Sequence, residues 1–344
     1  VVVLVPVLAL VFLIRRYRKH GVDPSIPASV VVRYEPPEGI SAGAIGTVVD
    51  EKVDMADITA TIVDLAVRGY LTIETDVEEK FFGLKKEERT SFRRDSGQSV
   101  SDLLPHERLV LDGIFEADPA LVTVEDLKEE FYTHIPGISS ALYERLVDKG
   151  LVVGNPQTVR RKTVGLGVAV AVLTAAGGMA WALSQGAVFP NAAILPIGSA
   201  ILTMALFSIF APAMPRRSKE GVRAAAWAKG FEEFADRVES DRMERDAARD
   251  VFEKLLPYAM ALGVATRWSR KFEGIYDEES PRWYVGPHHS VHQFSTVSFQ
   301  HSLHDAMQSA GESMASRPRS SGSSGSGGGG FSGGGGGGGG GGSW

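Results

Sequence analysis

Three histidines near the C-terminal end have the spacing most suggestive of chemistry: His288, His289 and His292. A His-His-x-x-His pattern could supply nitrogen ligands to zinc or nickel. No carboxylate lies among the three histidines, and the surrounding sequence is typical of an unstructured segment. We therefore interpret the pattern as part of a polar linker and assign no metal ligands, with a metal site as the alternative.

Other kinds of chemistry have little support in the sequence. The chain has no cysteine, which excludes disulfides, thiolate catalysis and cysteine metal sites. Gly83, Gly97 and Gly113 lie in no phosphate-binding pattern, and no nucleophile–base pair is recognisable. We assign no catalytic or cofactor-binding residue and do not expect an enzyme. A membrane-tethered enzyme remains the alternative, and a cluster of polar residues in a cytoplasmic pocket would favour it.

The strongest structural signal in the sequence is the stretch from Thr163 to Pro215, which contains no ionisable residue in 53 positions. A single helix of this length would be about 80 Å long, whereas the hydrocarbon core of a bilayer is ~30 Å thick. The sequence therefore predicts a transmembrane hairpin, with a buried core hairpin of a soluble protein as the alternative. We expect spans near Val164–Ser184 and Ala192–Ala213, joined by a turn that contains Gln185, Gly186, Pro190 and Asn191. A transporter would need charged groups within these spans, and none is present.

The sequence opens with a third apolar run, Val1–Ile14. Its 14 residues would cover about 21 Å as a helix, so we expect it to be the second half of a span whose start is missing. Basic clusters flank all three predicted spans, and Lys and Arg near span ends stay cytoplasmic. We expect a multi-pass protein of the cell membrane, with residues 15–162 and 216–344 in the cytoplasm. The clusters are Arg15, Arg16, Arg18 and Lys19; Arg160, Arg161 and Lys162; and Arg216, Arg217 and Lys219.

Within residues 15–162 the sequence predicts tandem winged-helix-like units, with a generic α+β domain as the alternative. Helical spacing with Asp57 as N-cap predicts a helix over Asp57–Arg68, and alternation predicts a strand over Tyr70–Glu74. The second unit repeats the pattern, with helices over Thr123–Phe131 and Ile138–Lys149 before Gly150. Without the border cations this domain has 13 basic and 26 acidic residues, so its charge repels nucleic acid. We expect no nucleic acid partner and interpret the fold as a protein-interaction or self-association module.

Residues 216–285 predict a small helical domain with helices over Ala224–Val238 and Arg245–Leu256, the second broken or kinked at Pro257. From residue 286 onward His, Ser and Gly dominate, which is typical of a disordered tail. The expected fold class is thus a membrane α+β protein with transmembrane helices, the winged-helix-like domain, the helical domain and a Gly-rich tail. Its expected parts are residues 1–14, 15–162, 163–215, 216–285 and 286–344.

Several segments together resemble one family. They are Tyr34-Glu-Pro-Pro-Glu-Gly39, the run Asp57–Leu71, the run Leu256–Val264 and the glycine-rich end before Ser343-Trp344. These segments resemble the bacterial predicted membrane proteins called domain of unknown function 2207, the YciQ-like proteins, over nearly all of the chain. The resemblance implies an extracytoplasmic domain before the first span, which we expect to be missing from this sequence. It implies no catalytic residue.

These observations lead to one hypothesis about function. We expect a membrane scaffold or regulatory protein that holds its cytoplasmic modules at the lipid bilayer, where they bind a protein partner or a second copy. The hypothesis rests on spans without charged residues, an acidic domain and a flexible tail.

Overall fold

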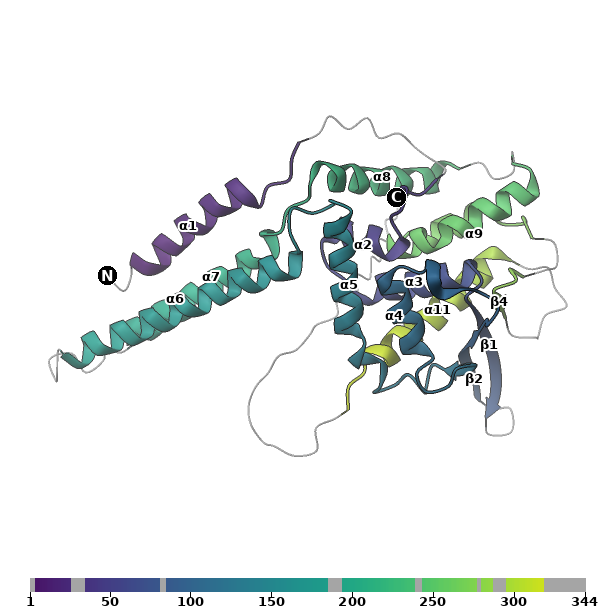
Figure 1. The fold of residues 1–344 in the computed structure, drawn as a ribbon, viewed down its shortest axis with the longest axis horizontal. Helices are drawn as coiled ribbons and strands as arrows, with labels where there is room; N and C mark the ends of the chain where they lie inside the picture. The colour runs from purple at the N-terminus through teal and green to yellow at the C-terminus, as the bar shows by residue number, and fades with distance from the viewer. Residues whose placement is uncertain are drawn as a thin grey trace, which may run out of the picture.

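The structure, a computed structural model, describes residues 4–25, 35–80, 85–184, 194–238, 243–276, 280–286 and 295–318. Three apolar helices extend from one side of a body that is built of shorter helices and a small sheet (Figure 1). The residues of the predicted hairpin turn, and the histidines His288, His289 and His292, lie outside the described residues.

The extension consists of α1 (Leu4–His20), α6 (Pro156–Ser184) and α7 (Ile194–Phe210), with a short 3-10 turn, η4 (Ala211–Ala213), after α7. Helices α6 and α7 pack along their length, and α1 packs on α7. Two helices, Pro156–Ser184 and Ile194–Ala213, are long and apolar enough to cross a membrane, with mean hydropathies of 1.9 and 2.1. Their C-terminal ends, Ser184 and Ala213, are the predicted C-terminal ends of the two spans.

Small residues allow α6 and α7 to approach each other closely. A Cβ atom on Gly167 would collide with Phe207, and one on Gly178 would collide with Pro196, whereas Gly165 has open space around it. Gly167 and Gly178 therefore line the helix contact, whereas Gly165 does not.

The sheet of the body has the strand order β3-β2-β1-β4. Its strands are β1 (Leu71–Lys80), β2 (Lys85–Arg94), β3 (Leu121–Thr123) and β4 (Tyr284–Val285). β1 and β2 form an antiparallel hairpin that pairs Ile73 with Phe92, and β4 joins β1 in parallel. Ile73 and Phe92 are both fully buried, so the alternation in the sequence correctly predicts the beginning of β1.

The helices of the body come from both sides of the apolar hairpin. They are α2 (Ala42–Asp50), α3 (Met55–Val67), α4 (Pro105–Ile114), α5 (Ile135–Asp148), α8 (Lys219–Arg237), α9 (Arg245–Ala261), α10 (Ala265–Lys271) and α11 (Thr296–Ala315), with 3-10 turns η1 (Val100–Asp102) and η2 (Phe131–Thr133). One continuous hydrophobic core runs from Ile40 to Met314. The predicted division into separate domains at 15–162 and 216–285 therefore differs from the packing, because α9 packs directly on α2 and α3.

The C-terminal part also differs from the prediction. Residues 286–344 were expected to be disordered, yet 296–315 form α11, whose Phe299, Leu303 and Met314 are buried in the core. Serine and histidine on the outer face of α11 lower the average hydrophobicity of this stretch, which is why composition alone predicts a tail. Its apolar face packs on α3 and α10.

Helix α3, which covers most of the predicted helix Asp57–Arg68, is the central helix of the body. It packs against α2, α4, α9 and α11, and its residues from Asp57 to Ala66 are buried except for Asp64. Helix α8, which contains Trp227, packs on α2 and α10. The face of α3 is therefore occupied by the chain itself, mainly by α9 and α11.

Three local predictions need correction. The N-cap of α3 is Asp54, and Asp57 is the third helical residue, which completes a capping box with it. Residues from Thr123 to Phe131 form the end of β3 and turns in place of a helix, although Thr123 and Asp126 exchange the expected capping bonds. Pro257 lies inside α9, which continues to Ala261.

Within the described residues, a β-hairpin follows the helix of the first predicted unit and not that of the second. After α3 the chain forms the β1–β2 hairpin, but after α5 Val152 makes an isolated bridge with Arg217. The amide of Val153 donates to the carbonyl of Arg216 at 3.0 Å, so this segment pairs with the chain that leaves α7. Within the described residues the second unit has no hairpin, because Val152 pairs with Arg217, which follows the apolar hairpin in the sequence.

Candidate functional site

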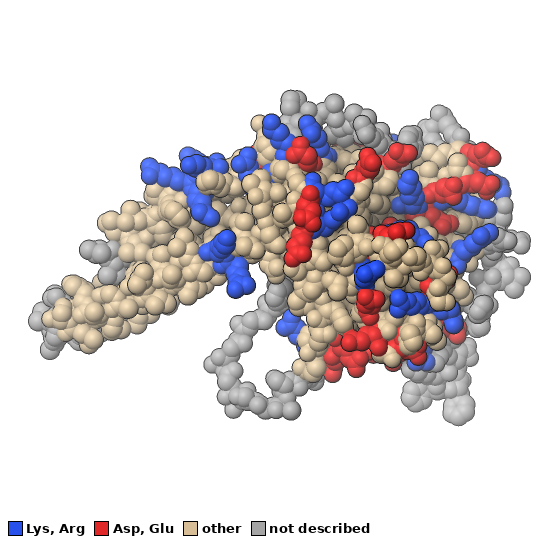
Figure 2. Space-filling view, viewed as in Figure 1, with Lys and Arg blue, Asp and Glu red and all other residues tan. Residues whose placement is uncertain are grey.

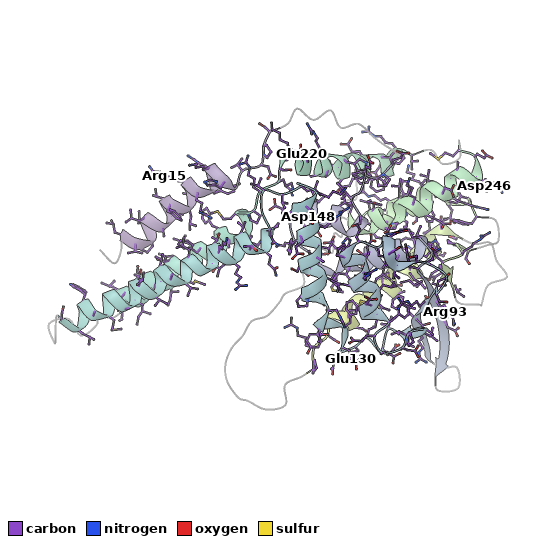
Figure 3. All side chains as sticks on the ribbon, in the orientation of Figure 1. Arg15, Arg93, Glu130, Asp148, Glu220 and Asp246 are labelled. Carbon is purple, nitrogen blue, oxygen red and sulfur yellow. The ribbon has the colours of Figure 1, made fainter. Side chains whose placement is uncertain are left out.

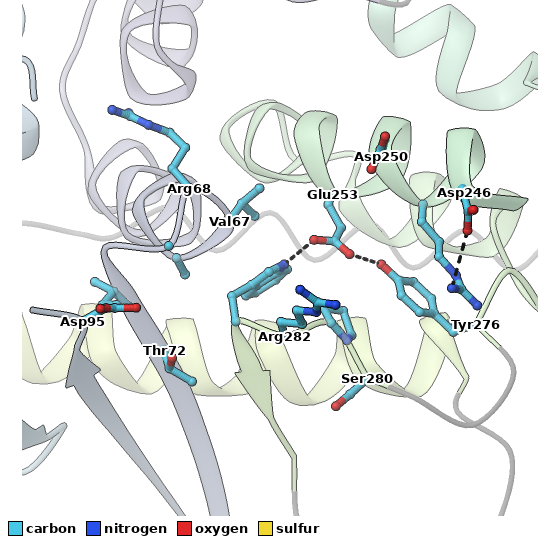
Figure 4. A pocket seen from close by; sticks show the side chains of 16 residues that line it. Val67, Arg68, Thr72, Asp95, Asp246, Asp250, Glu253, Tyr276, Ser280 and Arg282 are labelled. Carbon is cyan, nitrogen blue, oxygen red and sulfur yellow. Dashed lines mark hydrogen bonds and ion pairs between the residues drawn. The ribbon is translucent and has the colours of Figure 1, made fainter. Parts of the chain in front are cut away.

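The sequence assigned no site residues, and the structure contains one pocket in which charged side chains converge. The pocket has a volume of about 560 Å³ and lies between the C-terminal end of α3, the beginning of β1, α9 and the segment before β4 (Figure 4). Its charged lining consists of three arginines and four carboxylates: Arg68, Arg249, Arg282, Asp95, Asp246, Asp250 and Glu253.

Glu253 lies at the centre of this pocket. Its side chain accepts hydrogen bonds from the hydroxyl of Tyr276 on one oxygen and from Trp283 Nε1, at 2.8 Å, on the other (Figure 4). Burial, followed by the hydrogen bond to Glu253, raises the pKa of Tyr276, so the tyrosine keeps its proton and acts as the donor. These two hydrogen bonds fix the position of the carboxylate of Glu253. Because both donors are neutral, they do not cancel its charge.

Arg249, one turn earlier on α9, is also held in place. Its Nε donates to the carbonyl of Ile275 at 3.0 Å, and its guanidinium lies 5.2 Å from the ring centroid of Tyr276. The carboxylate of Asp246 is 3.9 Å from Arg249 and is largely exposed, so this pair is weak.

Arg68, at the opposite wall, is turned toward carboxylates outside the pocket. Its Nη1 lies 2.9 Å from Asp64 and 2.9 Å from Glu107, and Glu107 is almost fully buried. Because one guanidinium faces two carboxylates, Arg68 contributes little positive charge to the pocket. The remaining charges, two arginines against four carboxylates, give the pocket a negative field.

Among the described residues, the lining of the pocket is charged, aromatic and hydroxyl-bearing and contains no histidine. Within the described residues, no group of three or more His, Cys, Asp or Glu side chains could hold a metal ion. Thr72 and Ser280 supply aliphatic hydroxyls, and Ser280 donates to the carbonyl of Tyr284 at 3.2 Å. The negative field and the aromatic walls suit a positively charged group.

Sequence reasoning missed a serine–histidine pair elsewhere in the body. Ser41 Oγ and His106 Nε2 lie 3.0 Å apart, although 65 residues separate them in the chain. His106 is fully buried, its Nδ1 has no partner within the described residues, and burial lowers its pKa to about 4. A general base needs a pKa near the working pH and a group that orients the ring. The pair is therefore a buried structural contact at the start of α2.

A second buried polar group lies between α2 and α3. Asp57 is 2% exposed, and its Oδ2 accepts from Thr47 Oγ1 at 2.8 Å and from the amide of Asp54 at 3.2 Å. Burial and the neighbouring Asp54 raise its pKa well above the ordinary value. A Cβ on Gly46 would overlap with this carboxyl group, so glycine is required at that position.

The three basic clusters that border the apolar helices converge in space. Arg15, labelled on α1 in Figure 3, Arg161 and Arg217 come from segments far apart in the sequence. Each lies two or three residues after a member of one apolar cluster, which contains Leu13, Val159 and Met214. On the face shown in Figure 2, blue side chains gather where the helices meet the body, and the outer length of the helices is tan.

Two of these cations bind the body directly. Arg217 donates from Nε to the carbonyl of Val48 at 2.7 Å, from Nη2 to the carbonyl of Val49, and from Nη1 to Asp23 at 2.7 Å. Arg160 Nη2 donates to the carbonyl of Glu51 at 2.7 Å. The last carbonyls of a helix have no intrahelical donors, so the two arginines cap the C-terminal end of α2 from the two inner ends of the hairpin.

Comparison with known proteins gives one match. Residues 31–272 match the family model described as the C-terminal domain of predicted membrane protein DUF2207. No curated protein and no solved structure matches the chain. The matched region includes α2 to α10 and both apolar helices of the hairpin, and it ends before β4 and α11.

Proposed function

Because this chain belongs to the DUF2207 family of predicted membrane proteins, we propose that it is a membrane-anchored interaction protein. Helices α6 and α7 cross the cell membrane as a hairpin, α1 crosses beside them, and the body lies in the cytoplasm. There the body binds a protein partner or a second copy of the chain. The winged-helix-like first unit, from α2 to the β1–β2 hairpin, is part of this interaction body.

The observation that carries the proposal is the convergence of the three basic clusters at the body end of the apolar helices. Lys and Arg near span ends stay on the cytoplasmic side. Clusters that lay at opposite ends of the bundle would have contradicted a common orientation. The exposed apolar side chains on these helices support the same view, since Leu173 is 72% and Ile209 is 70% exposed. In water such a surface would be unfavourable, whereas lipid would cover it.

Cysteine labelling tests the topology, and the chain is suited to it because it contains no native cysteine. Ser184→Cys lies at the far end of α6, and Glu144→Cys lies on the exposed face of α5. A membrane-impermeant maleimide applied to intact cells should label only the first variant. Permeabilised cells should show labelling of both. Labelling of Glu144→Cys in intact cells would overturn the proposed orientation.

The pocket is the proposed contact point for the partner, because its exposed carboxylates and aromatic walls suit a basic side chain. Asp250, which is exposed on α9, lies at its rim. Crosslinking and affinity purification from solubilised membranes should recover a partner or a dimer with the native chain and lose it with Asp250→Arg. The control is Asp118→Arg, an exposed carboxylate outside the pocket. Recovery of neither a partner nor a dimer with the native chain would count against the interaction role.

A membrane-tethered enzyme is the second candidate, and the convergence of polar groups in the pocket favours it. Glu253 would be the residue to test, since it is the carboxylate fixed at the centre. Hydrolysis of any substrate in a panel by the purified chain, abolished by Glu253→Gln and retained by Asp118→Asn, would support this candidate. If Asp250→Arg loses the partner and the purified native chain hydrolyses no substrate in the panel, the interaction role is supported.

A further inference from the structure

The ten cations at the membrane border differ in their surroundings. Arg160 and Arg217 point inward and cap α2, as described above. Arg216 is half-buried and Lys219 is exposed at the start of α8. The other six are exposed on α1 and α6: Arg15, Arg16, Arg18, Lys19, Arg161 and Lys162. No ion pair joins any of these six to a carboxylate within the described residues, so their charge is not neutralised by that part of the chain. We call these six residues the basic belt.

The belt lies at one level along the apolar helices. Leu13 of α1, Val159 of α6 and Met214 after α7 pack in one apolar cluster, which fixes the height of the three segments relative to one another. The belt residues follow Leu13 by two to six positions and Val159 by two or three. Helix α1 runs toward the body and α6 runs away from it. At a rise of ~1.5 Å per residue, the α1 cations therefore start about 3–9 Å on the body side of this cluster and the α6 cations about 3–5 Å on its far side. The long side chains of Lys and Arg reach along the helix, so their charges can enter one headgroup layer, which is ~5–8 Å thick.

Exposed apolar side chains begin directly beyond the belt. On α1, Val11 is 43% and Phe12 is 44% exposed, and on α6, Leu166 is 42% and Val168 is 45% exposed. A molecule with a negatively charged head at the belt would therefore place its hydrocarbon chains against these side chains. Charge and apolar surface occur in the order in which a phospholipid presents them.

We propose that the basic belt binds the headgroups of anionic phospholipids in the leaflet next to the body. This inference rests on the proposed membrane anchoring of α1, α6 and α7. The residues of the body supply a further reason. Residues 15–162 carry 13 basic and 26 acidic groups apart from the border cations, so an anionic membrane surface repels the body. The belt attracts the same surface, and it holds the acidic body close to the bilayer.

The test uses the full chain reconstituted in vesicles of equal parts phosphatidylcholine and phosphatidylglycerol. After extraction in mild detergent, native mass spectrometry measures how much of each lipid stays bound. The native chain should retain phosphatidylglycerol in preference to phosphatidylcholine. Each cation near a lipid surface contributes a factor of about five. The triple variant Arg15→Gln, Arg16→Gln, Arg18→Gln should therefore lower this preference by at least about fivefold.

A control of equal charge change distinguishes the belt from net charge. Lys128→Gln, Lys254→Gln and Arg270→Gln together remove three exposed cations from the body, and this variant should keep the native preference. Glycerol 1-phosphate, which has the phosphate but no acyl chains, should not displace the bound lipid. Equal retention of the two lipids by the native chain, an equal loss in the control, or displacement by glycerol 1-phosphate would each overturn the inference.

Labelling of the two cysteine variants in the same vesicles separates this inference from the proposed anchoring. If Ser184→Cys and Glu144→Cys lie on opposite sides and the lipids are still retained equally, the belt inference alone fails. If both positions lie on the same side, the anchoring itself fails.

Discussion

The apolar extension and the body use similar residues for opposite purposes. In the body, Trp268 is fully buried and stacks among other rings, 5.3 Å from Phe231 and 4.5 Å from Phe272. In the extension, Trp181 is 49% and Leu183 is 74% exposed, and α6 leaves no room for a Cβ atom where Gly167 and Gly178 face α7. Large side chains therefore hold the body together, whereas small ones hold the hairpin together.

The difference reflects the surroundings of the two regions, which are water for the body and, in the anchoring that we propose, lipid for the extension. Burial of large apolar side chains stabilises a fold only where the alternative is water. Between helices in lipid that gain is absent, and close backbone approach gives van der Waals contact instead. Substitution of a large buried side chain should therefore affect the body, and substitution of a glycine at the helix contact should affect the hairpin.

The largest expected effect is the loss of a core tryptophan. Trp268→Ala should lower the free energy of unfolding of the body by about 3–5 kcal/mol, because it removes a buried ring and leaves a cavity. Trp181→Ala, on the outer face of α6, should change it by less than about 0.5 kcal/mol. Denaturant unfolding in detergent, followed by near-UV circular dichroism, measures both. Similar losses in the two variants would remove the distinction between the regions.

Next in size is a pH effect that belongs to the body alone. Since burial holds the pKa of His106 at about 4, below the ordinary 6.5, the folded state binds fewer protons than the unfolded state between these values. The contribution of His106 to stability is therefore complete above pH 6.5 and is lost as the pH decreases toward 4, by about 3 kcal/mol in total. The raised pKa of Asp57 acts in the opposite direction, because the folded state binds a proton there more tightly than the unfolded state. Unfolding measured across this range should show the slope.

His106→Gln should remove this slope, because glutamine does not titrate. His301→Gln, an exposed histidine on α11, is the matched control and should leave the slope unchanged. If the free energy of unfolding of His106→Gln depends on pH as it does in the native chain, other groups cause the acid sensitivity.

An intermediate effect is expected where the two regions join. Arg217→Gln removes the cation that caps α2 and pairs with Asp23, and hydrogen bonds to charged groups contribute about 1.5–3 kcal/mol each when buried. Because Arg217 is 21% exposed, we expect a loss near the lower limit, about 2 kcal/mol. Hydrogen exchange should also increase at the C-terminal end of α2. Lys219→Gln, an exposed cation two residues later, should have neither effect.

The smallest effect in this series tests the hairpin by itself. Gly167→Ala puts a methyl group against Phe207 and should weaken the packing of α6 on α7 by about 1–2 kcal/mol. Gly165→Ala, two residues earlier on the same helix, meets open space and should be neutral. Protease sensitivity of the purified chain in lipid nanodiscs can compare the two. If the variants behave alike, glycine does not determine the helix contact.

The sequence predicted the elements whose signals are local. The apolar length of α6 and α7, the glycine after α3 and the alternation at Leu71 and Ile73 each depend on neighbouring residues, and the structure agrees with them. Helix α11 escaped prediction because its apolar positions are diluted by serine and histidine.

The candidate site could not be predicted, because its residues meet only in three dimensions. Glu253 meets Trp283 thirty positions later, and Arg68 meets Glu107 across β1, β2 and η1. No spacing in the sequence reports such contacts. A useful signal was nevertheless present in Asp246, Asp250 and Glu253, whose spacing of four and three places them on one face of a helix.

The single core of the body has a consequence for how the protein is made. Residues of α2 to α5 leave the ribosome first, but α9, which covers α3, is separated from α3 by the whole hairpin. At ~5–20 residues per second, the hundred or so residues between α5 and the middle of α9 take on the order of ten seconds to synthesise. During that interval the face of α3 that α9 covers has no partner. In the topology that we propose, the hairpin enters the membrane before the body can finish folding. Insertion is therefore a step in the folding pathway of the body, and a chaperone that shields α3 while translation continues would act in this interval.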